Sequence, residues 1–480
     1  MQSKGAIMSD TLFNKPLELH TTNIPGLVWL DLPVNGDNRG WFQEKWQRAK
    51  MVEKGLPDFG PIQNNMSFNE KAGVTRGVHA EPWDKYVSVG TGRIFGAWVD
   101  LREGESFGQV FTLEVDPSKA VYVPRGVGNA FQVLEDQTLY SYLVNDHWSA
   151  DGDYAFLNLA DSVSDITWPI NLKDAVLSDK DKVHPELSGV TPIKARKILV
   201  TGANGQLGKA LQIEFPDAEF VDRSTFDISD TSTWGDRNWR QYSTIINAAA
   251  YTKVDAAETP EGKVDAWKAN ATAVKELALL ANENNLTLIH VSSDYVFDGT
   301  QETHTEDESF SPLGVYGQTK AAGDITVATV PKHYIVRTSW VVGDGNNFVR
   351  TMEKLAKDGV DPAVVDDQFG RPSFTEDIAK GIKHLLESGV PFGTYNLSND
   401  GPVVSWRDLA KAVFEATGND PKRVGAQTTA EFIAKRLKSD STVSPRPQQS
   451  SLRLEKIKKE GFSPRSWEKA LNTYLTEQSD

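Results

Sequence analysis

Three side chains, Ser293, Tyr316 and Lys320, are of the types needed to protonate a carbonyl oxygen during its reduction. Hydride addition to a ketone creates an alkoxide, which needs an acid and a nearby cation that stabilises the anion of that acid. Tyr316 and Lys320 are four residues apart, so on a helix they share one face and the ammonium group can lower the pKa of the phenol. Ser293 adds a hydroxyl group that can polarise the carbonyl. A Tyr/Lys pair alone is common on helix surfaces, but the three residues together predict a hydride-transfer site.

A glycine-rich turn predicts a dinucleotide cofactor for this site. Gly202, Gly205 and Gly208 directly follow an apolar run over residues 197–201. In such a turn glycine permits positive φ and close approach to a pyrophosphate, and the following helix offers N–H groups to the anion. The turn alone is equally consistent with an ordinary strand-to-helix connection. Its place upstream of Ser293 in the same domain favours a nicotinamide cofactor.

Two neighbouring residues give opposite indications about the ribose of that cofactor. Asp222 at the end of the second strand favours the hydroxyl groups of NADH, whereas Arg223 favours the 2′-phosphate of NADPH, so both cofactors stay open. Asp227 lies where a side chain can reach the adenine or can stabilise a turn. The predicted cofactor contacts are Gly202, Asn204, Gly205, Gln206, Leu207, Gly208, Asp222, Arg223, Asp227, Ile228, Ala248, Ala249, Ala250, Tyr316 and Lys320.

Composition limits the remaining possibilities. A chain of 480 residues with 39% hydrophobic content is too long for one core and favours two or three domains. Its net charge of −15 argues against nucleic acid and anionic membranes as partners, except at small basic pockets. The absence of cysteine excludes disulfides, thiolate metal sites and a cysteine nucleophile. Neither residues 1–10 nor any later segment has the apolar run of a signal peptide or membrane span, so we expect a cytoplasmic protein.

The predicted elements change in kind near residue 190. Upstream, short runs rich in valine and aromatic residues over 86–102, 109–115 and 120–123 are typical of antiparallel strands in a sandwich or barrel. Downstream, strands are predicted over 197–201, 244–248, 286–292 and 334–338, with a helix over 266–282. This alternation is typical of a parallel, doubly wound sheet. We therefore predict one domain over 1–187, a linker over 188–195 and a second domain over 196–480.

The downstream half resembles dTDP-4-dehydrorhamnose reductase, a Rossmann-type extended short-chain dehydrogenase with a small C-terminal substrate-binding lobe. The matching stretches are 247–258, 292–299, 316–320, 337–340, 367–372 and 446–447. The resemblance implies reduction of a nucleotide-linked keto sugar, with Asp294, Tyr295, Trp340 and Arg371 as substrate contacts. Trp340 is equally consistent with a place in the core. Ser293 replaces the threonine usual in that family and keeps the hydroxyl group, and the resemblance also makes Mg²⁺ possible for this half.

The upstream half resembles dTDP-4-dehydrorhamnose 3,5-epimerase over 36–44, 63–67, 76–79, 99–102, 124–126, 168–169 and 177–181. The resemblance implies a metal-free cupin-like jelly roll, usually dimeric, that inverts C3 and C5 of a 4-keto sugar. A carbon beside a ketone loses its proton only to a well-placed base, with the enolate oxygen stabilised. By resemblance His79 is the base, Asp181 orients it and Lys85 stabilises the enolate. The implied substrate contacts are Arg39 and Arg76 at the diphosphate, with Glu44, Gln63 and Asn65.

No metal is expected at His79, because His20, His147 and His184 lack the ligand spacing of metal-binding cupins. The upstream half also departs from the family pattern. Trp148 stands where the family carries the tyrosine that protonates the sugar, and an indole N–H cannot act as that acid. Asn129 and Asp153 replace a histidine and a glutamate of the family. The missing proton could come from His147, Tyr142, Tyr154 or water, or the domain could invert one centre only or be inactive.

Three functions are compatible with these patterns. The favoured one is a bifunctional enzyme that completes dTDP-L-rhamnose from a dTDP-linked 4-keto-6-deoxy sugar, as a homodimer. The alternative keeps an active reductase beside a degenerate epimerase domain that binds sugar nucleotide or dimerises. The third is non-catalytic, since the downstream half also resembles the regulatory subunit of methionine adenosyltransferase. Ser293, Tyr316 and Lys320 oppose that third function.

Overall fold

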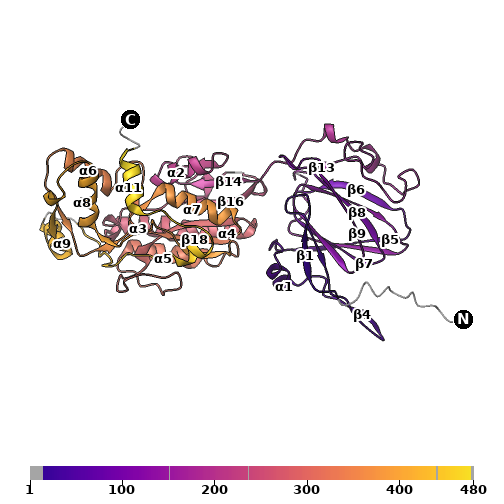
Figure 1. Cartoon of the computed structure of the whole chain (residues 1–480), viewed down its shortest axis with the longest axis horizontal. Coiled ribbons are helices and arrows are strands. Elements are labelled where there is room, and N and C mark those ends of the chain that lie inside the picture. The colour runs from indigo at the N-terminus through magenta and orange to yellow at the C-terminus, as the bar shows by residue number, and fades with distance from the viewer. Residues whose placement is uncertain (1–14, 151, 236, 439–441, 477–480) are drawn as a thin grey trace. The chain divides into compact units, whose positions relative to one another are not determined.

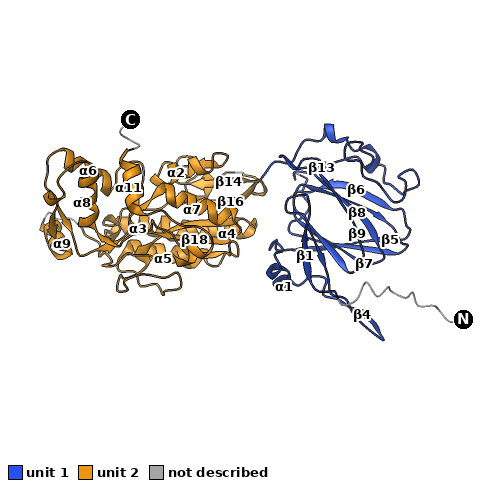
Figure 2. Cartoon of the chain, viewed as in Figure 1, with its two compact units in different colours: residues 1–195 blue, residues 196–480 orange. Residues whose placement is uncertain are grey.

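The computed structural model describes residues 15–150, 152–235, 237–438 and 442–476, and the chain divides into two compact units between Ala195 and Arg196 (Figures 1 and 2). The segment considered above as a signal peptide, residues 1–10, lies outside the described residues. No helix in the described part of the chain has the length and apolar character needed to span a membrane.

The first unit consists of two antiparallel sheets (Figure 1). The six-stranded sheet has the order β1 (Glu18–Thr21), β2 (Val28–Asp31), β10 (Lys119–Val123), β7 (Lys85–Thr91), β12 (Thr138–Val144) and β5 (Gln63–Asn69). The five-stranded sheet has the order β13 (Ala155–Phe156), β6 (Thr75–Ala80), β11 (Val127–Val133), β8 (Ile94–Asp100) and β9 (Val110–Val115). A hairpin of β3 (Asn35–Asp37) and β4 (Gly40–Phe42) and the short helix α1 (Arg48–Glu53) complete the unit.

Alternating side chains of the two sheets form the core of the first unit. Val87 and Tyr140 from the six-stranded sheet meet Trp98 and Phe131 from the five-stranded sheet. The rings of Phe131 and Tyr140 stack with their centroids 4.1 Å apart. Because successive residues of a strand point to opposite faces, this core fixes which side chains lie between the sheets. The predicted all-β sandwich is confirmed.

The second unit is built on a parallel six-stranded sheet, as predicted. Its order is β15 (Glu219–Val221), β14 (Lys197–Thr201), β16 (Tyr242–Asn247), β17 (Thr287–Ser293), β18 (His333–Thr338) and β23 (Gly393–Asn396). The helices α2 (Gln206–Glu214), α3 (Pro260–Trp267), α4 (Ala273–Glu283), α5 (Val315–Val327) and α7 (Thr375–Glu387) connect these strands. Apolar side chains cover both faces of the sheet, in two separate core clusters. Both faces of such a sheet are buried, which explains the continuous apolar runs of its strands.

A single helix predicted over 266–282 is interrupted in the structure. A π-helical turn over Lys268–Thr272 separates α3 from α4. The side chain of Asn270 in this turn is buried, and its amide bonds both the backbone N–H and the carbonyl of Tyr251. Periodicity could not show this turn, because its cause is a polar contact with a distant segment.

A smaller lobe forms around buried Phe414 and Trp467. Its helices are α6 (Phe348–Lys357), α8 (Trp406–Ala416), α9 (Thr429–Lys438) and α11 (Trp467–Thr476), and α10 (Glu455–Lys459) lies against β23. Short strands pair here: β19 (Val341–Val342) with β22 (Ser373–Phe374), β20 (Ala363–Val365) with β25 (Gly425–Gln427), and β21 (Phe369–Gly370) with β24 (Val404–Ser405).

The segment expected to be a linker, residues 188–195, belongs to the first unit. Ile193 is buried, and its backbone N–H donates to the carbonyl of Leu101 at 2.8 Å. Its own carbonyl accepts from the N–H of Glu103 at 2.9 Å. One apolar residue in an otherwise polar stretch therefore anchors the segment.

Candidate active sites

The glycine-rich turn of the second unit connects β14 to α2. Gly202 has a φ of +76°, which a residue with a side chain rarely adopts. A Cβ atom at Gly208 would lie 2.1 Å from the carbonyl oxygen of Gly202, so only glycine lets the helix begin this close to the strand. The first turn of α2 has N–H groups without helical acceptors and a partial positive charge. This cradle fits the pyrophosphate of a dinucleotide.

An open hollow of 460 Å³ adjoins the turn, lined by Ala203, Asn204, Gln212, Pro216, Phe220, Asp222 and Thr225. The amide of Asn204 donates to Asp222 at 2.6 Å, and hydrogen bonds from the side chain and backbone of Ser224 lower the pKa of the Asp222 carboxyl group. Arg223 is exposed beside it and bonds Asp227 at 3.0 Å. The carboxylate and the guanidinium expected to recognise the ribose therefore both lie at this end of the sheet.

The other predicted cofactor contacts lie around the same turn. The loop of Ala248, Ala249 and Ala250 follows β16 and packs closely against Gly202. A Cβ atom added at Gly202 would lie 2.8 Å from the backbone nitrogen of Ala249. Ile228 differs, because its side chain is buried in the core beside the sheet, which leaves its backbone as the part that can face a nucleotide.

Lys320 is almost completely removed from water, with 1% of its surface exposed. Its Nζ donates to the carbonyl of Val291 at 2.7 Å and lies 3.3 Å from Nε2 of His290. Burial lowers the pKa of Lys320 to about 8, although Asp324 opposes this shift. The ammonium group is thus poised near physiological pH.

Tyr316, the predicted acid, is hydrogen-bonded to Ser293. The two hydroxyl groups are hydrogen-bonded, and Ser293 itself donates to Asp294 at 3.0 Å. Burial raises the pKa of Tyr316 to about 12, opposed by its bond to Ser293. This direction is opposite to the sequence expectation that Lys320 lowers that pKa, because burial outweighs the other effects in the free site. Tyr316 therefore keeps its proton across the physiological range.

The residues expected to contact a substrate surround this acid. Tyr295 meets Tyr316 edge to face at 5.7 Å between ring centroids, and burial raises the pKa of Asp294 to about 6. Trp340 has a φ of +45° and stacks on Trp406 at 3.7 Å, so one face of its indole lies in the wall of the lobe. A bulky residue rarely adopts that backbone conformation, which commonly marks a functional site.

Arg371 occupies a buried position in the wall of the lobe. Its guanidinium donates to the hydroxyl of Ser451 at 3.1 Å and to the carbonyl of Leu452 at 2.7 Å, and lies 3.4 Å from Asp400. These contacts tie the sheet-side loop to the C-terminal segment. They give Arg371 a structural role in addition to the substrate contact predicted from the sequence.

In the first unit, His79 faces the space between the two sheets. It lies directly opposite Asn129 in the ladder of β6 and β11, so both side chains point to the same face. The amide of Asn129 donates to the hydroxyl of Tyr140 at 3.1 Å, across to the other sheet. Lys85 and Tyr142 stand on that other sheet, with Nζ of Lys85 5.4 Å from the ring centroid of Tyr142. Residues predicted to be catalytic, His79 and Lys85, thus face a common interior from the two sheets.

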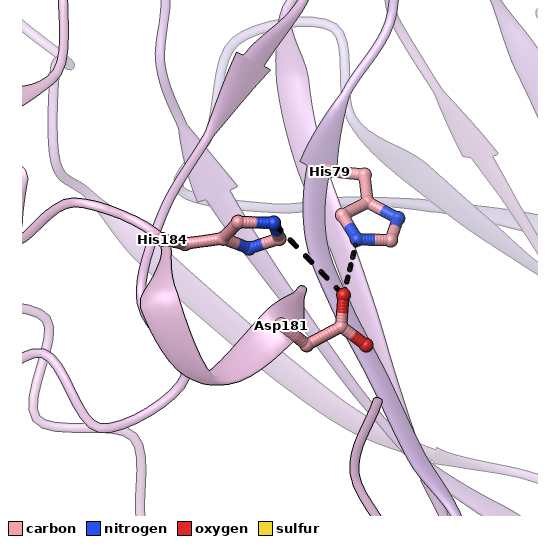
Figure 3. Close-up of side chains that lie close together, drawn as sticks. All are labelled: His79, Asp181 and His184. Carbon is pink, nitrogen blue, oxygen red and sulfur yellow. Dashed lines mark hydrogen bonds and ion pairs between the residues drawn. The ribbon is translucent and has the colours of Figure 1, made fainter. Parts of the chain in front are cut away.

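Asp181 and His184 complete the surroundings of His79 (Figure 3). Nε2 of His79 lies 2.9 Å from Oδ1 of buried Asp181, although the two residues are 102 positions apart. Nε2 of His184 lies 4.0 Å from the same oxygen, and its ring meets that of His79 edge to face at 5.4 Å. Burial, followed by the nearby His79, lowers the pKa of His184. His184 was considered from the sequence only as a metal ligand, and its spacing from Asp181 on a 3₁₀ turn was the available indication of this place beside His79.

Lys85 is 6% exposed and forms an ion pair with Glu81, four residues earlier. Burial, and then the charge of Glu81, raises the pKa of Tyr142, whereas Arg76 opposes that shift. The sequence analysis also missed Glu81. Its spacing from Lys85 could have indicated it, because a buried ammonium group needs a counter-charge.

Three of the predicted substrate contacts lie on the inner faces. Arg76 is opposite Phe131 in the ladder, and Asn65 is opposite Tyr142. The amide of Gln63 donates to Asn65 at 2.8 Å, and its oxygen lies 2.8 Å from Nδ1 of His147.

Arg39 and Glu44 lie elsewhere. They belong to the β3–β4 hairpin and the segment after it, and the hairpin projects away from the sheets (Figure 1). Arg39 pairs with Asp37, and Glu44 pairs with Lys50. Within one chain, the structure does not bring these two residues to His79.

The positions that depart from the epimerase pattern differ in their surroundings. Trp148 is 73% exposed, and Tyr154 accepts a hydrogen bond from the backbone N–H of Ser149 at 3.3 Å. Asp153 pairs with Arg125 at 2.9 Å. Of the groups considered as the missing acid, Tyr142 is the one that stands beside the buried ammonium group of Lys85.

Clusters of histidine and carboxylate side chains close enough to share a metal ion occur twice among the described residues, and both lie in the first unit. They are His79, Asp181 and His184, and Glu18, His20 and Asp31. The described part of the second unit has no such cluster within one chain, so nothing in it supports the magnesium ion considered from the sequence. No chemical step is assigned to a metal here.

Comparisons with known proteins divide the chain in the same way. The model of the RmlD substrate binding domain matches residues 196–479, and that of dTDP-4-dehydrorhamnose 3,5-epimerase matches residues 21–189. A protein named RmlC homolog from Streptococcus pyogenes is 52% identical over 199 residues, 40% of this chain and 100% of that protein. A dTDP-4-dehydrorhamnose reductase from Aggregatibacter actinomycetemcomitans is 36% identical over 304 residues, 57% of this chain and 97% of its own.

The fold of the second unit is found in a solved structure. The crystal structure of dTDP-4-dehydrorhamnose reductase from Bacillus anthracis in complex with NADP is 32% identical, with a TM-score of 0.52. The similarity covers 59% of this chain and 99% of that chain.

Substitution of Gly208 by alanine is expected to weaken dinucleotide binding at least about tenfold, because the new Cβ atom meets a backbone oxygen and pushes α2 away from the strand. Gly425→Ala is the matched control, since its Cβ atom would make only ordinary contacts, the nearest at 3.6 Å. Titration of NADPH fluorescence against each variant measures the effect. Equal affinities for both variants would contradict the assignment of the turn.

Proposed function

We infer the function from two memberships: the chain belongs to the RmlD substrate-binding-domain family over residues 196–479 and to the dTDP-4-dehydrorhamnose 3,5-epimerase family over residues 21–189. We propose that the first unit inverts C3 and C5 of dTDP-4-dehydro-6-deoxy-D-glucose. The second unit then reduces C4 of the product, which completes dTDP-L-rhamnose. The observation that carries this proposal is the presence of one acid–base set in each unit, His79 with Asp181 and Tyr316 with Lys320.

In the first unit, His79 removes the proton from a carbon beside the ketone. Asp181 accepts a hydrogen bond from the ring, which orients His79 and stabilises its charged form. The electrons move onto the C4 oxygen, where the ammonium group of Lys85 stabilises the enolate.

Inversion requires a new proton from the opposite side of the sugar. Tyr142 is our candidate for this acid, because it stands on the sheet opposite the one that carries His79 and lies beside Lys85. The charge of Lys85 stabilises the phenolate after the proton has left. With Tyr142 in this role, Trp148 and Asn129 give no reason to regard the domain as degenerate.

In the second unit, the turn of Gly202 and Gly208 would hold the pyrophosphate of NADPH, which when bound supplies the hydride. NADPH is proposed over NADH, because exposed Arg223 can meet a 2′-phosphate and the Bacillus anthracis relative binds NADP. When the sugar binds, the hydroxyl of Ser293 turns from Asp294 and donates its hydrogen bond to the C4 carbonyl. Tyr316 gives its proton to the C4 oxygen as the alkoxide forms, and Lys320 stabilises the phenolate.

A homodimer is proposed from the exposed edge of the first unit. β5 is the last strand of its sheet, and its outward side chains Met66 and Phe68 are 65% and 58% exposed. Exposed apolar residues on an edge strand favour pairing with another chain. The projecting hairpin carries exposed Phe42 and Arg39. In the proposed dimer, Arg39 would contact the diphosphate bound by the partner chain. A cytoplasmic location and the absence of nucleic-acid or membrane partners stay predictions.

Two variants separate the proposed activities. His79→Asn is expected to prevent epimerisation, and Tyr316→Phe to prevent reduction, so neither variant alone converts dTDP-4-dehydro-6-deoxy-D-glucose into dTDP-L-rhamnose. A mixture of the two is expected to restore the product, detected by NMR. Product from His79→Asn alone, or none from the mixture, would refute the assignment.

The pH dependence of the reduction is expected to follow Lys320. A lysine whose pKa is lowered to about 8 is charged below that pH and neutral above it, whereas Tyr316, with a pKa raised to about 12, stays protonated. At limiting sugar, kcat/KM therefore falls as pH rises through about 8. Excess Tyr316→Phe protein supplies the epimerised sugar. Lys320→Arg, which stays charged, is expected to be slower but to lose this decline. A rate that rises above pH 8 would contradict the assignment.

The acid of the first unit is tested by exchange in D₂O, in a chain that also carries Tyr316→Phe. Tyr142→Phe is expected to slow inversion about 100-fold while His79 still exchanges the proton it removes. Trp148→Phe is the control and is expected to change little, because Trp148 is exposed. NMR of the recovered sugar measures both processes. Inversion that is abolished by Trp148→Phe and retained in Tyr142→Phe would contradict the assignment of Tyr142.

Dimer formation is tested by charge on the edge strand. The double substitution Met66→Glu and Phe68→Glu is expected to give a monomer by light scattering, because two carboxylates would be buried in the interface. Val163→Glu changes an equally exposed apolar residue away from β5 and is expected to leave the dimer intact. A monomeric unsubstituted chain would rule out the proposed interface.

A further inference from the structure

A row of buried polar side chains continues from Lys320 through the parallel sheet. Nζ of Lys320 lies 3.3 Å from Nε2 of His290 on β17, and Nδ1 of His290 lies 3.0 Å from the amide nitrogen of Asn247 on β16. The amide oxygen of Asn247 accepts from the hydroxyl of Thr201 on β14 at 2.7 Å. All four side chains are buried. Buried polar groups lower the stability of the fold unless each has a hydrogen-bond partner. A row of them across three adjacent strands therefore suggests a function.

The direction of the hydrogen bonds in this row depends on the charge of Lys320. A neutral imidazole has one N–H and one lone pair. If the amide nitrogen of Asn247 donates to Nδ1, the proton of His290 sits on Nε2 and points toward Lys320. Lys320 can accept a hydrogen bond from this N–H only when its amine is uncharged. With the amide turned over, Nδ1–H donates to the oxygen of Asn247, and Nε2 accepts from a charged Lys320. In this second arrangement the amide oxygen takes the place of the nitrogen beside Nδ1, and the amide nitrogen donates to the hydroxyl of Thr201.

The electrostatic surroundings keep His290 neutral. Burial, and then the charge of Lys320, holds the pKa of His290 well below its usual value. The charged or titratable groups facing Lys320 are Tyr316 and Asp324 on its own helix, His290 on β17 and, through Asp324, Arg337 on β18, which donates to Asp324 at 3.0 Å. Among the described side chains, His290 is the one with an acceptor atom within hydrogen-bonding distance of Nζ of Lys320, at 3.3 Å.

We propose that His290 is a positioning residue of the reductase site, held as the Nδ1–H tautomer with the amide oxygen of Asn247 turned toward it, so that Nε2 accepts a hydrogen bond from the charged form of Lys320. The proposal rests on the proposed reductase function. One N–H of Lys320 then goes to the carbonyl of Val291 and one to His290, which leaves the third for the active site. His290 thereby helps to set both the direction of the ammonium group and the pH at which it loses its charge.

Two substitutions at one position test this role. In His290→Gln the side-chain oxygen can take the place of Nε2 and accept from Lys320, whereas in His290→Asn the shorter amide reaches only toward Asn247. The alkaline decline of kcat/KM is therefore expected to move about one pH unit lower in His290→Asn, the effect of losing one hydrogen bond to a charged group. It is expected to stay in place in His290→Gln. NADPH affinity and the melting temperature of each variant serve as controls for folding.

An unchanged decline in both folded variants, with an active unsubstituted chain, would overturn the proposal. An inactive unsubstituted chain would instead count against the proposed reductase function. ¹⁵N NMR of the histidine-labelled full-length protein tests the tautomer without turnover, with His290 identified by its absence from the spectrum of His290→Gln. The Nδ1–H form is the expected result, and the Nε2–H form would overturn the proposal.

Discussion

Each unit holds an ammonium group away from water at its candidate active site, and the neighbouring residues follow from that constraint. Lys85 and Lys320 are both buried, and a buried cation is costly unless polar groups replace its water. The two sites meet this requirement differently. Glu81 gives Lys85 a full counter-charge, whereas Lys320 is held by a backbone carbonyl and a neutral imidazole. The second arrangement leaves Lys320 with a pKa of about 8, close to the pH at which it must act.

Both folds place their acids and bases by the same principle, with rigid strands that bring distant residues together. In the first unit, ladder pairing directs His79 and Tyr142 into one interior from opposite sheets. In the second, the parallel strands end at the same edge of the sheet, so the glycine-rich turn after β14 and Ser293 at the end of β17 lie on that edge with β16 between them. Because the two units are joined in one chain, the product released by the first unit meets a higher local concentration of the second site.

Much of this could be read from the sequence, because it depends on local patterns. The alternation of strands, the glycine turn and the Tyr316–Lys320 spacing all predicted what the structure contains. What could not be predicted depends on contacts between distant segments. The π-helical turn at Asn270 is held by a contact with Tyr251, His290 reaches Lys320 from a separate element, and the burial that raises the pKa of Tyr316 has no sequence pattern.

The central claim is that one chain performs both steps, and the most direct test supplies it with a single sugar. The unsubstituted protein is incubated with dTDP-4-dehydro-6-deoxy-D-glucose and NADPH, cofactor oxidation is followed by absorbance, and the sugar product is identified by NMR. The account predicts oxidation with formation of dTDP-L-rhamnose and no other enzyme present. Oxidation that begins only after a separate epimerase is added would contradict it.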